Sequence, residues 1–314
     1  MKILVTGSSG FIGYHLVKRL LNDGHQVVGI DNHNDYYDVS LKVLRKNKCL
    51  NKNFTFVLND INKLNIINDK FDIAINLAAQ AGVRVPKNKE YLYAHSNVNG
   101  FRSFCNFCKK MNINKIIYAS SSSVYSDSED TKYQEINTKL KPKSIYGDSK
   151  LANEKYASKF SKENNISFIG LRFFSVYGPY GRPDMAYFSF SNSLINNKPI
   201  FLNNKGEMFR DMTFISDVIE GVLKAINYSF QNNFQHELFN IGNDSPIKTL
   251  KLLSTLEKKF NKKAIVINKS TKNEAKKTRA DITKAKNLLG YIPKVSYEEG
   301  IEQFTQWYKK YENI

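Results

Sequence analysis

A tyrosine and a lysine four residues apart form a pair that can carry out acid–base chemistry. Tyr146 and Lys150 stand at the start of a segment with helical character, so their side chains share one face. A nearby ammonium favours the phenolate and lowers the pKa of a phenol, which would make Tyr146 a base for an alcohol proton. The run Ser120–Ser123 precedes the pair, and one of its hydroxyls can bridge a substrate and Tyr146. A Tyr-x-x-x-Lys spacing also arises by chance, and its ordinary explanation is a surface pair.

A glycine-rich segment near the N-terminus has the composition of a phosphate-binding loop. Gly7, Gly10 and Gly13 lie between a short apolar run and a helical pattern, so backbone N–H groups can approach a diphosphate there. Asp31 ends the next apolar run, where a carboxylate accepts hydrogen bonds from ribose hydroxyls and repels a 2′-phosphate. This pattern predicts NAD rather than NADP, with glycines used for packing alone as the competing explanation. Asp60, after a third apolar run, is either an adenine contact or a turn residue.

Short apolar runs alternate with helical stretches over about the first 175 residues. Strands are expected at Met1–Thr6, Gln26–Asp31, Phe54–Asn59, Ile73–Leu77, Lys115–Ser120, Phe168–Phe173 and Glu237–Ile241. Helices are expected at Phe11–Asn22, Val98–Lys110, Ser149–Glu163, Phe188–Asn196, Asp217–Asn227, Thr249–Phe260 and Tyr297–Tyr311. The alternation predicts an α/β fold, a doubly wound parallel sheet of the Rossmann type with a smaller α+β C-terminal lobe. The first domain would comprise residues 1–174 and about 214–243, and the second lobe residues 175–213 and 244–314.

The chain is basic, with 47 Lys+Arg against 29 Asp+Glu and a net charge of +18 over 314 residues. The lysines are dispersed, and the local runs 42–52 and 269–279 lack the interleaved aromatic residues of single-strand binders. We therefore expect both runs to be solvated surface, and no nucleic acid partner. The sequence contains no apolar stretch of membrane-spanning length, so no membrane association is expected.

The cysteines and histidines give no sign of a metal or disulfide framework. Three cysteines suit a reducing, cytoplasmic setting. Cys105 and Cys108 have redox or zinc spacing but lie inside a helical pattern, so we expect two buried apolar residues instead. The five histidines are scattered, and no metal site is expected.

Taken together, these motifs resemble those of extended short-chain dehydrogenases/reductases, and within that family the nucleotide-sugar 4-epimerases. The resemblance covers nearly the whole chain and is carried by Gly7–Gly13, Asp31-Asn32, Asn76–Gln80, Ser120–Tyr125, Tyr146–Lys150, Leu171–Pro179, Arg210-Asp211, Ala280-Asp281 and Leu288–Tyr291. Three segments resemble the UDP-glucuronate 4-epimerases specifically, namely Asp31–Asp38 with Leu41-Lys42, Ala78–Arg84 and Gly181–Met185.

The resemblance implies an NAD-dependent isomerase that inverts carbon 4 of a UDP-sugar through a 4-keto intermediate, most readily UDP-glucuronate to UDP-galacturonate. In that family Tyr146 would take the proton of the 4-hydroxyl, Lys150 would hold the nicotinamide ribose, and Ser121 would complete the hydrogen-bond path. The implied cofactor-binding residues are Gly7, Gly10, Phe11, Ile12, Gly13, Asp31, Asn32, Asp60, Ile61, Leu77, Ala78, Ala79, Gln80, Asn97, Tyr146 and Lys150. The alternatives are a 4-epimerase of neutral UDP-glucose or UDP-N-acetylglucosamine, and a catalytically inactive NAD-binding regulator. Polysaccharide biosynthesis is the usual destination of such products.

The serine run separates the reactions of related enzymes. Related 4,6-dehydratases carry Asp-Glu where Ser122 and Ser123 stand, and related decarboxylases carry Glu at the position of Ser123. A hydroxyl cannot replace a carboxylate as a base at neutral pH. The two serines therefore favour epimerisation without elimination or decarboxylation.

The implied substrate-binding residues are Arg84, Ser121, Ser122, Ser123, Ser175, Arg182, Arg210 and Asp281. Arg182 and Arg84 are candidates for the sugar carboxylate or its neighbouring phosphate, because a guanidinium makes bidentate pairs with either. Surface salt bridges are the competing explanation. Asn273–Ala275 departs from the Gly-Asp pair that relatives often carry there. The helices Val98–Lys110 and Ser149–Glu163 would form the four-helix interface of a homodimer in this family.

Overall fold

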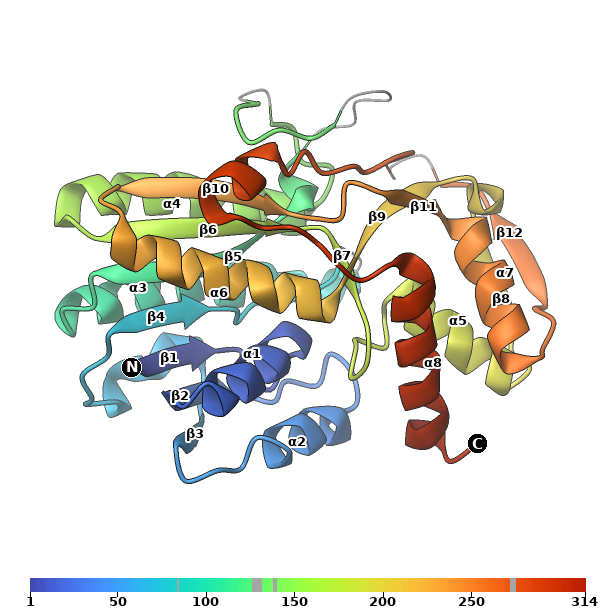
Figure 1. The fold of residues 1–314 in the computed structure, drawn as a ribbon, viewed down its shortest axis with the longest axis horizontal. Helices are drawn as coiled ribbons and strands as arrows, with labels where there is room; N and C mark the ends of the chain where they lie inside the picture. The colour runs from blue at the N-terminus through green and yellow to red at the C-terminus, as the bar shows by residue number, and fades with distance from the viewer. Residues whose placement is uncertain (84, 126–131, 138–139, 272–274) are drawn as a thin grey trace.

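A seven-stranded parallel sheet forms the centre of the molecule (Figure 1). The computed structural model describes residues 1–83, 85–125, 132–137, 140–271 and 275–314. The strands are β1 (Lys2–Thr6), β2 (Gln26–Asp31), β3 (Phe54–Leu58), β4 (Ile73–Asn76), β5 (Lys115–Ser121), β6 (Ser167–Phe173) and β10 (His236–Ile241). Their order is β10-β6-β5-β4-β1-β2-β3, which confirms the doubly wound sheet and places the late strand beside β6. The order reverses direction between β1 and β4, and ligands of such sheets bind at that point.

Helices cover both faces of the sheet because the strands are buried on both sides. Helices α1 (Phe11–Asn22) and α6 (Ile215–Gln231) pack on one face, where Ile3 and Val5 of β1 join their core. Helices α3 (Gly100–Lys110) and α4 (Ile145–Asn164) pack on the other, where Leu4 points. The alternation of neighbouring residues between two cores is the period-2 pattern of a strand.

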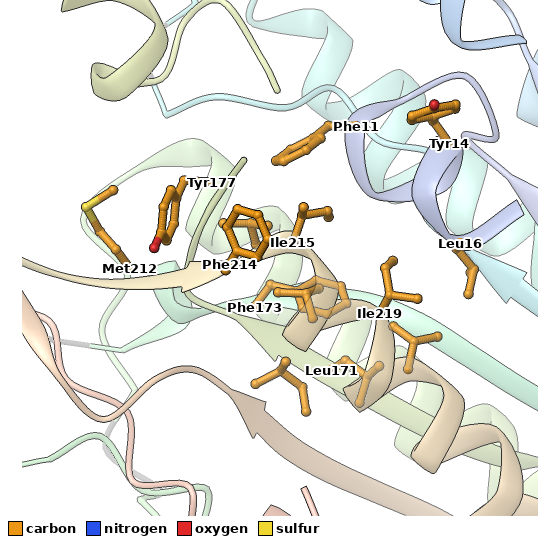
Figure 2. Packing of buried hydrophobic residues seen from close by; sticks show 14 of the residues in the cluster. Phe11, Tyr14, Leu16, Leu171, Phe173, Tyr177, Met212, Phe214, Ile215 and Ile219 are labelled. Atoms are coloured by element: carbon orange, nitrogen blue, oxygen red, sulfur yellow. The ribbon is translucent and has the colours of Figure 1, made fainter. Parts of the chain in front are cut away.

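The C-terminal lobe is built around two small sheets, shown at the right of Figure 1. One sheet contains β7 (Ser175–Tyr177), β9 (Phe209–Phe214) and β11 (Pro246–Lys248), and the other β8 (Ile200–Asn203) and β12 (Val266–Lys269). Helices α5 (Ala186–Ile195), α7 (Thr249–Phe260) and α8 (Tyr297–Glu312) pack in the same lobe. Figure 2 shows one buried cluster that draws on both lobes. Its labelled side chains include Phe11, Leu16, Ile215 and Ile219 from α1 and α6 on the central sheet, and Tyr177, Met212 and Phe214 from β7 and β9 of the C-terminal lobe.

Several short elements, and helix α2 (Val39–Asn47), were not predicted. The short ones are η1 (Ile61–Ile66), η2 (Lys87–Lys89), η3 (Tyr93–Asn99), η4 (Ser122–Val124), η5 (Asn204–Gly206) and η6 (Ala285–Leu289). In α2, Lys42 is 5% exposed and Arg45 is 0% exposed. The expectation of a solvated surface for the run 42–52 is therefore wrong at these two residues, because polar groups of the surrounding loops accept their N–H donors.

Cys105 and Cys108 are buried in α3 with free thiols, which confirms their assignment as apolar helix residues. Burial raises the pKa of both thiols. Among the helices of the described residues, none has the length and apolar character that a bilayer crossing requires.

Candidate active site

The glycine loop between β1 and α1 leaves bare backbone at the start of the helix. Gly7 has φ +72°, and a Cβ added there would lie 2.7 Å from the backbone nitrogen of Ala78. A Cβ on Gly13 would lie 2.0 Å from the Gly7 carbonyl oxygen, so neither position tolerates a side chain. Helix α1 begins after Gly10, where no described side chain caps it. The loop therefore offers N–H groups and a positive helix end to an anion, which fits the diphosphate of NAD.

Asp31 ends β2 with both carboxylate oxygens fixed by the backbone. The N–H of Ser9 donates to one oxygen at 3.1 Å, and the N–H of His33 donates to the other at 2.9 Å. Each oxygen keeps a second lone pair for a ribose hydroxyl, so the site fits NAD. Asn32 lies beside Asp60, to which its amide donates at 3.4 Å.

A cavity of about 1240 Å³ runs from the glycine loop into the C-terminal lobe. The predicted residues that line it are Gly7, Gly10, Phe11, Ile12, Gly13, Asp31, Asn32, Ile61, Leu77, Ala78, Ala79, Gln80, Ser121, Ser122, Ser123, Tyr146, Lys150, Ser175, Arg182 and Arg210. Of the predicted residues that the structure describes, Asp60, Asn97 and Asp281 lie outside this lining. Arg84 falls outside the described residues. One cavity thus joins the dinucleotide loop, the Tyr/Lys pair and the second lobe.

Tyr146, Lys150 and Ser121 meet at the carboxyl end of β5. Tyr146 lies in the first turn of α4. The Lys150 ammonium donates to the Ala119 carbonyl of β5 at 2.9 Å and lies 5.8 Å from the centre of the Tyr146 ring. The Ser121 hydroxyl accepts the N–H of Ser123 at 3.1 Å, which orients it at the strand end. A phenol, an ammonium and a hydroxyl are thereby brought together as the sequence predicts.

The electrostatics of the pair differ from the expectation. Burial raises the pKa of the Tyr146 phenol, the charge of Arg182 and hydrogen bonding with Ser121 oppose this rise, and Asp184 adds to it. Burial also lowers the pKa of the Lys150 ammonium to about 8, although the negative charge of Glu154 acts to raise it. The expected net lowering of the Tyr146 pKa by Lys150 is therefore wrong in this structure, because desolvation outweighs the charges and Arg182 supplies the main opposing one.

Asn97 lies behind the lining and joins two parts of the site. Its side-chain oxygen accepts the N–H of Gln80 at 2.7 Å, and its amide donates to the Ser149 hydroxyl at 2.9 Å. Ser149 in turn donates to the backbone carbonyl of Tyr146 at 2.7 Å. The side-chain oxygen of Gln80 is buried in the cavity wall and has no described hydrogen-bond partner. This oxygen fits a donor group of a bound cofactor.

Arg182 projects into the cavity as half of an ion pair. Its Nε donates to Asp184 at 3.0 Å, and a terminal nitrogen bonds the second carboxylate oxygen. The Tyr36 hydroxyl also donates to Asp184, at 3.2 Å. Although burial raises it, the charge of Arg182 holds the pKa of Asp184 below its ordinary value. The competing explanation, a surface salt bridge, is right that Arg182 has an acidic partner. It does not fit the location of the side chain, which is only 22% exposed and lines the cavity.

Ser175 of β7 and Arg210 of β9 line the far end of the cavity. The Arg210 guanidinium donates to the Ala275 carbonyl at 2.8 Å. Asp281 lies further out, where it accepts the N–H of Thr283 at 2.9 Å. In the described ranges, no cluster of His, Cys, Asp or Glu is arranged to hold a metal ion.

Sequence reasoning missed three residues that line the cavity and one that lies behind its wall. Tyr36 and Asp184 lie inside segments that carry the resemblance, but only their contact in space assigns them to Arg182. Tyr93 packs its ring 6.2 Å from that of Tyr146. Arg45 was missed because hydrophobic periodicity assigns a cation to the surface.

The comparisons with known proteins agree with this geometry. Residues 3–242 match the sequence model of the NAD dependent epimerase/dehydratase family. UDP-glucuronate 4-epimerase 1 of Arabidopsis thaliana is 35% identical, and the alignment covers 99% of this chain and 77% of that protein. The UDP-glucuronic acid 4-epimerase of Bacillus cereus, solved with UDP-glucuronic acid and NAD, has a TM-score of 0.91 and 35% identity, covering 99% of this chain and 100% of that one. MoeE5, solved with UDP-glucose and NAD, has a TM-score of 0.88 and 27% identity over 99% of this chain and 100% of its own. With its dinucleotide loop, its Tyr/Lys pair and these matches, the chain belongs to the NAD-dependent epimerase/dehydratase family.

Proposed function

We propose that this protein interconverts UDP-glucuronate and UDP-galacturonate by NAD-dependent inversion at carbon 4. The observation that carries the proposal is the meeting of Tyr146 and Arg182 in one cavity with the glycine loop. UDP-glucuronate 4-epimerases match nearly the whole chain, which supports the same substrate class.

The chain's own residues divide the work of the reaction. The chemistry that bound NAD supplies is hydride acceptance from carbon 4 of the sugar and hydride return. Tyr146 takes the proton of the 4-hydroxyl and gives it back, while hydrogen bonding with Ser121 and the charge of Arg182 favour its phenolate. Lys150, whose ammonium donates to the Ala119 carbonyl and lines the cavity, would hold the nicotinamide ribose. The Gly7–Gly13 loop would hold the diphosphate of NAD, and Asp31 the hydroxyls of its adenosine ribose.

The serine run limits the reaction to epimerisation. Ser122 and Ser123 line the cavity with hydroxyls, which do not act as bases at neutral pH. Elimination of water and loss of CO₂ from the keto acid therefore lack a catalytic carboxylate at these positions. Ser121–Ser123 can hold the sugar carboxylate by hydrogen bonds instead.

Arg182 is the residue we assign to the anionic end of the substrate. A guanidinium matches a carboxylate or a phosphate in a bidentate pair, and Asp184 and Tyr36 fix its direction. Arg210 and Ser175 lie at the far end of the cavity, where we place the UDP diphosphate.

A neutral UDP-sugar is the second candidate substrate. Asp184 already balances the charge of Arg182, which reduces the need for a sugar carboxylate. MoeE5 has been solved both with UDP-glucose and with UDP-glucuronic acid, so related folds accept either.

The test is incubation of the purified protein with UDP-glucuronate without added NAD, followed by anion-exchange separation and proton NMR. Appearance of UDP-galacturonate with no UDP-pentose supports the proposal and a retained cofactor. Conversion of UDP-glucose or UDP-N-acetylglucosamine alone, with NAD added, supports the neutral-sugar alternative. A Tyr146→Phe variant that folds normally should lose turnover with every substrate.

We further propose that the protein works as a homodimer in the cytoplasm. Helices α3 and α4 lie side by side on one face of the sheet, as a four-helix interface between two copies requires. The three cysteines are buried free thiols, which suits a reducing compartment. Light scattering of the purified protein should give the mass of two chains, and the mass of one chain would contradict the dimer.

A further inference from the structure

The loop that carries Arg182 is held down by side chains of the NAD-binding half. This substrate loop, residues 178–185, joins β7 to α5. A ring nitrogen of His15, on α1, hydrogen-bonds the Pro179 carbonyl at 2.9 Å. The Arg45 guanidinium, on α2, donates to the Tyr180 carbonyl at 2.8 Å and to the Gly181 carbonyl at 2.8 Å. Consecutive carbonyls immediately before Arg182 are thus fixed from outside the loop.

The other side of the same guanidinium contacts the dinucleotide loop. Arg45 donates to the Ser9 carbonyl at 3.2 Å and to the Tyr37 hydroxyl at 2.6 Å. With Nε bonded to Tyr180 at 3.1 Å, the five hydrogen bonds use all five N–H donors of the group. Arg45 therefore bridges the loop that would bind the diphosphate of NAD and the loop that carries Arg182.

Arg45 is placed for geometry rather than for charge pairing. It is 0% exposed, and no carboxylate among the described residues forms an ion pair with it. A buried cation without a counter-ion is costly unless every donor is bonded, and here each donor meets a carbonyl or a hydroxyl. A lysine could not replace it, because a single ammonium cannot span both loops as a planar fork does.

The segment before α2 holds the far side of the substrate loop. The Tyr36 hydroxyl donates to Asp184, the ion-pair partner of Arg182. The backbone beside it is crowded, since a Cβ on Gly82 would lie 2.1 Å from the Tyr36 hydroxyl oxygen. Residues 36–45 therefore hydrogen-bond to the substrate loop on both sides of Arg182.

We propose that Arg45 is a positioning residue that sets Arg182 against the anionic end of the sugar, by tying the substrate loop to the dinucleotide loop. This inference rests on the proposed function, because it assumes that Arg182 binds the substrate carboxylate. It assigns to α2 a part in substrate selection, although Arg45 itself does not line the cavity.

A double-mutant cycle on the NAD-loaded protein tests the assignment. The variants are Arg45→Met, Arg182→Met and the double variant, with Arg19→Met as the control. Arg19 is a half-exposed arginine of α1 that bonds Asp23 and Glu220 away from the cavity. Calorimetry measures the Kd of UDP-glucuronate and of UDP-glucose for each protein, and the ratio of the two reports selection of the carboxylate.

We expect Arg182→Met to lower the preference for UDP-glucuronate about tenfold or more, because it removes a charge-assisted hydrogen-bonding partner of the sugar carboxylate. Arg45→Met should give most of this loss, the double variant no more than Arg182→Met alone, and Arg19→Met no change. Arg45→Lys should behave like Arg45→Met. Additive losses, equal weakening of both sugars, or an unchanged preference in Arg182→Met would each overturn the inference.

If Arg45→Met does not fold, Tyr36→Phe can be measured in its place, because this substitution removes only one hydroxyl. Tyr36→Phe should lower the preference for UDP-glucuronate over UDP-glucose without adding to the effect of Arg182→Met. An unchanged preference would contradict the fixing of the substrate loop by residues 36–45. These binding ratios need no turnover. Wild-type protein that binds UDP-glucuronate but does not epimerise it would refute the proposed function alone.

Discussion

Burial and charge act on the Tyr146 phenol in opposite directions. Desolvation raises its pKa, whereas the charge of Arg182 and hydrogen bonding with Ser121 lower it. A phenol acts as a base only in its ionised form, so the fraction of competent enzyme rises with pH until the pKa is passed. Each group that lowers this pKa therefore moves the rising limb of the pH profile toward neutrality.

Replacing Ser121 with alanine should shift that limb to higher pH. The variant loses a hydrogen bond that lowers the Tyr146 pKa, so less phenolate is present at any pH below the limb. We expect kcat at neutral pH to fall about 10²-fold, as general acid–base contributions do. Steady-state rates measured across pH check this, with Ser254→Ala as the control, since the exposed Ser254 hydroxyl bonds the Lys251 carbonyl within α7, and neither residue lines the cavity. A uniform loss of rate with an unshifted limb would contradict the role of Ser121.

Reactive residues were predictable where the chemistry demands a particular type and spacing. Tyr146, Lys150 and Ser121 meet because a strand end and a helix start must bring them together. Arg45 and Asp184 were not predictable as a pair of supports, because each acts through residues distant in the sequence. The charge balance at Tyr146 also depends on that folded arrangement.

Helix α4 is tied to β6 by a buried ion pair. Arg172 donates from two nitrogens to the two carboxylate oxygens of Glu154, at 2.8 Å and 2.7 Å. Both side chains are almost fully buried, at 1% and 4% exposed. Glu154 lies one turn after Lys150, so the pair fixes the helix that carries the proposed acid–base residues.

Glu154→Gln should destabilise the protein by roughly 3–5 kcal/mol, because it leaves the Arg172 cation buried without its counter-charge. Urea unfolding followed by circular dichroism measures the change. Lys159→Met, which removes one half of an exposed ion pair with Glu163 on the same helix, should change the free energy of unfolding by no more than about 0.5 kcal/mol. Equal effects of the two substitutions would show that burial does not govern the Glu154 pair.

Alanine substitutions at two glycines of the N-terminal half distinguish an effect on cofactor binding from an effect of backbone strain alone. Gly13→Ala would place a Cβ 2.0 Å from the Gly7 carbonyl, which distorts the dinucleotide loop. Gly24→Ala meets no described atom within 4 Å but keeps a φ of +82°, a strain of about 1–2 kcal/mol. We expect both to lower Tm and only Gly13→Ala to lose bound NAD, assayed by release of nucleotide from the purified protein. Full NAD content in Gly13→Ala would contradict the loop assignment.

Helices and strands were predictable where the apolar residues recur with a helical or strand period. Helix α2 shows why prediction from this periodicity failed elsewhere. In α2 the apolar Val43 is 38% exposed while the charged Lys42 and Arg45 are buried. Leu41 is buried as its apolar character predicts, but two cations share the buried face with it, so hydrophobic periodicity alone does not reveal the helix. Helix α1, whose Leu16 and Leu20 are both buried, was predicted to the residue.

The two lobes share one hydrophobic core. Ile3 and Val5 of the central sheet belong to the same buried cluster as Leu253 of α7 and Tyr308 of α8. Figure 2 shows part of this cluster, in which Phe173 of β6 and Tyr177 of β7 both take part. A core that crosses the boundary makes independent unfolding of either lobe costly.

We therefore expect one calorimetric unfolding transition for the whole chain, although the sequence suggests two domains. The van't Hoff and calorimetric enthalpies should agree in differential scanning calorimetry. Saturating UDP-glucuronate and NAD together should raise this single Tm, because the cavity spans both lobes. Two resolved transitions would contradict the shared core.

The strand β10 enters the sheet late, since 62 residues separate the end of β6 at Phe173 from its start at His236. During synthesis on the ribosome, β6 consequently exposes an open hydrogen-bonding edge until β10 emerges. Helix α6, which covers the adjoining face, emerges in the same interval. Arrested nascent chains that end before residue 215 should be digested rapidly by added protease, whereas chains that expose residue 241 should resist it. Premature termination between these points would yield fragments that depend on chaperones.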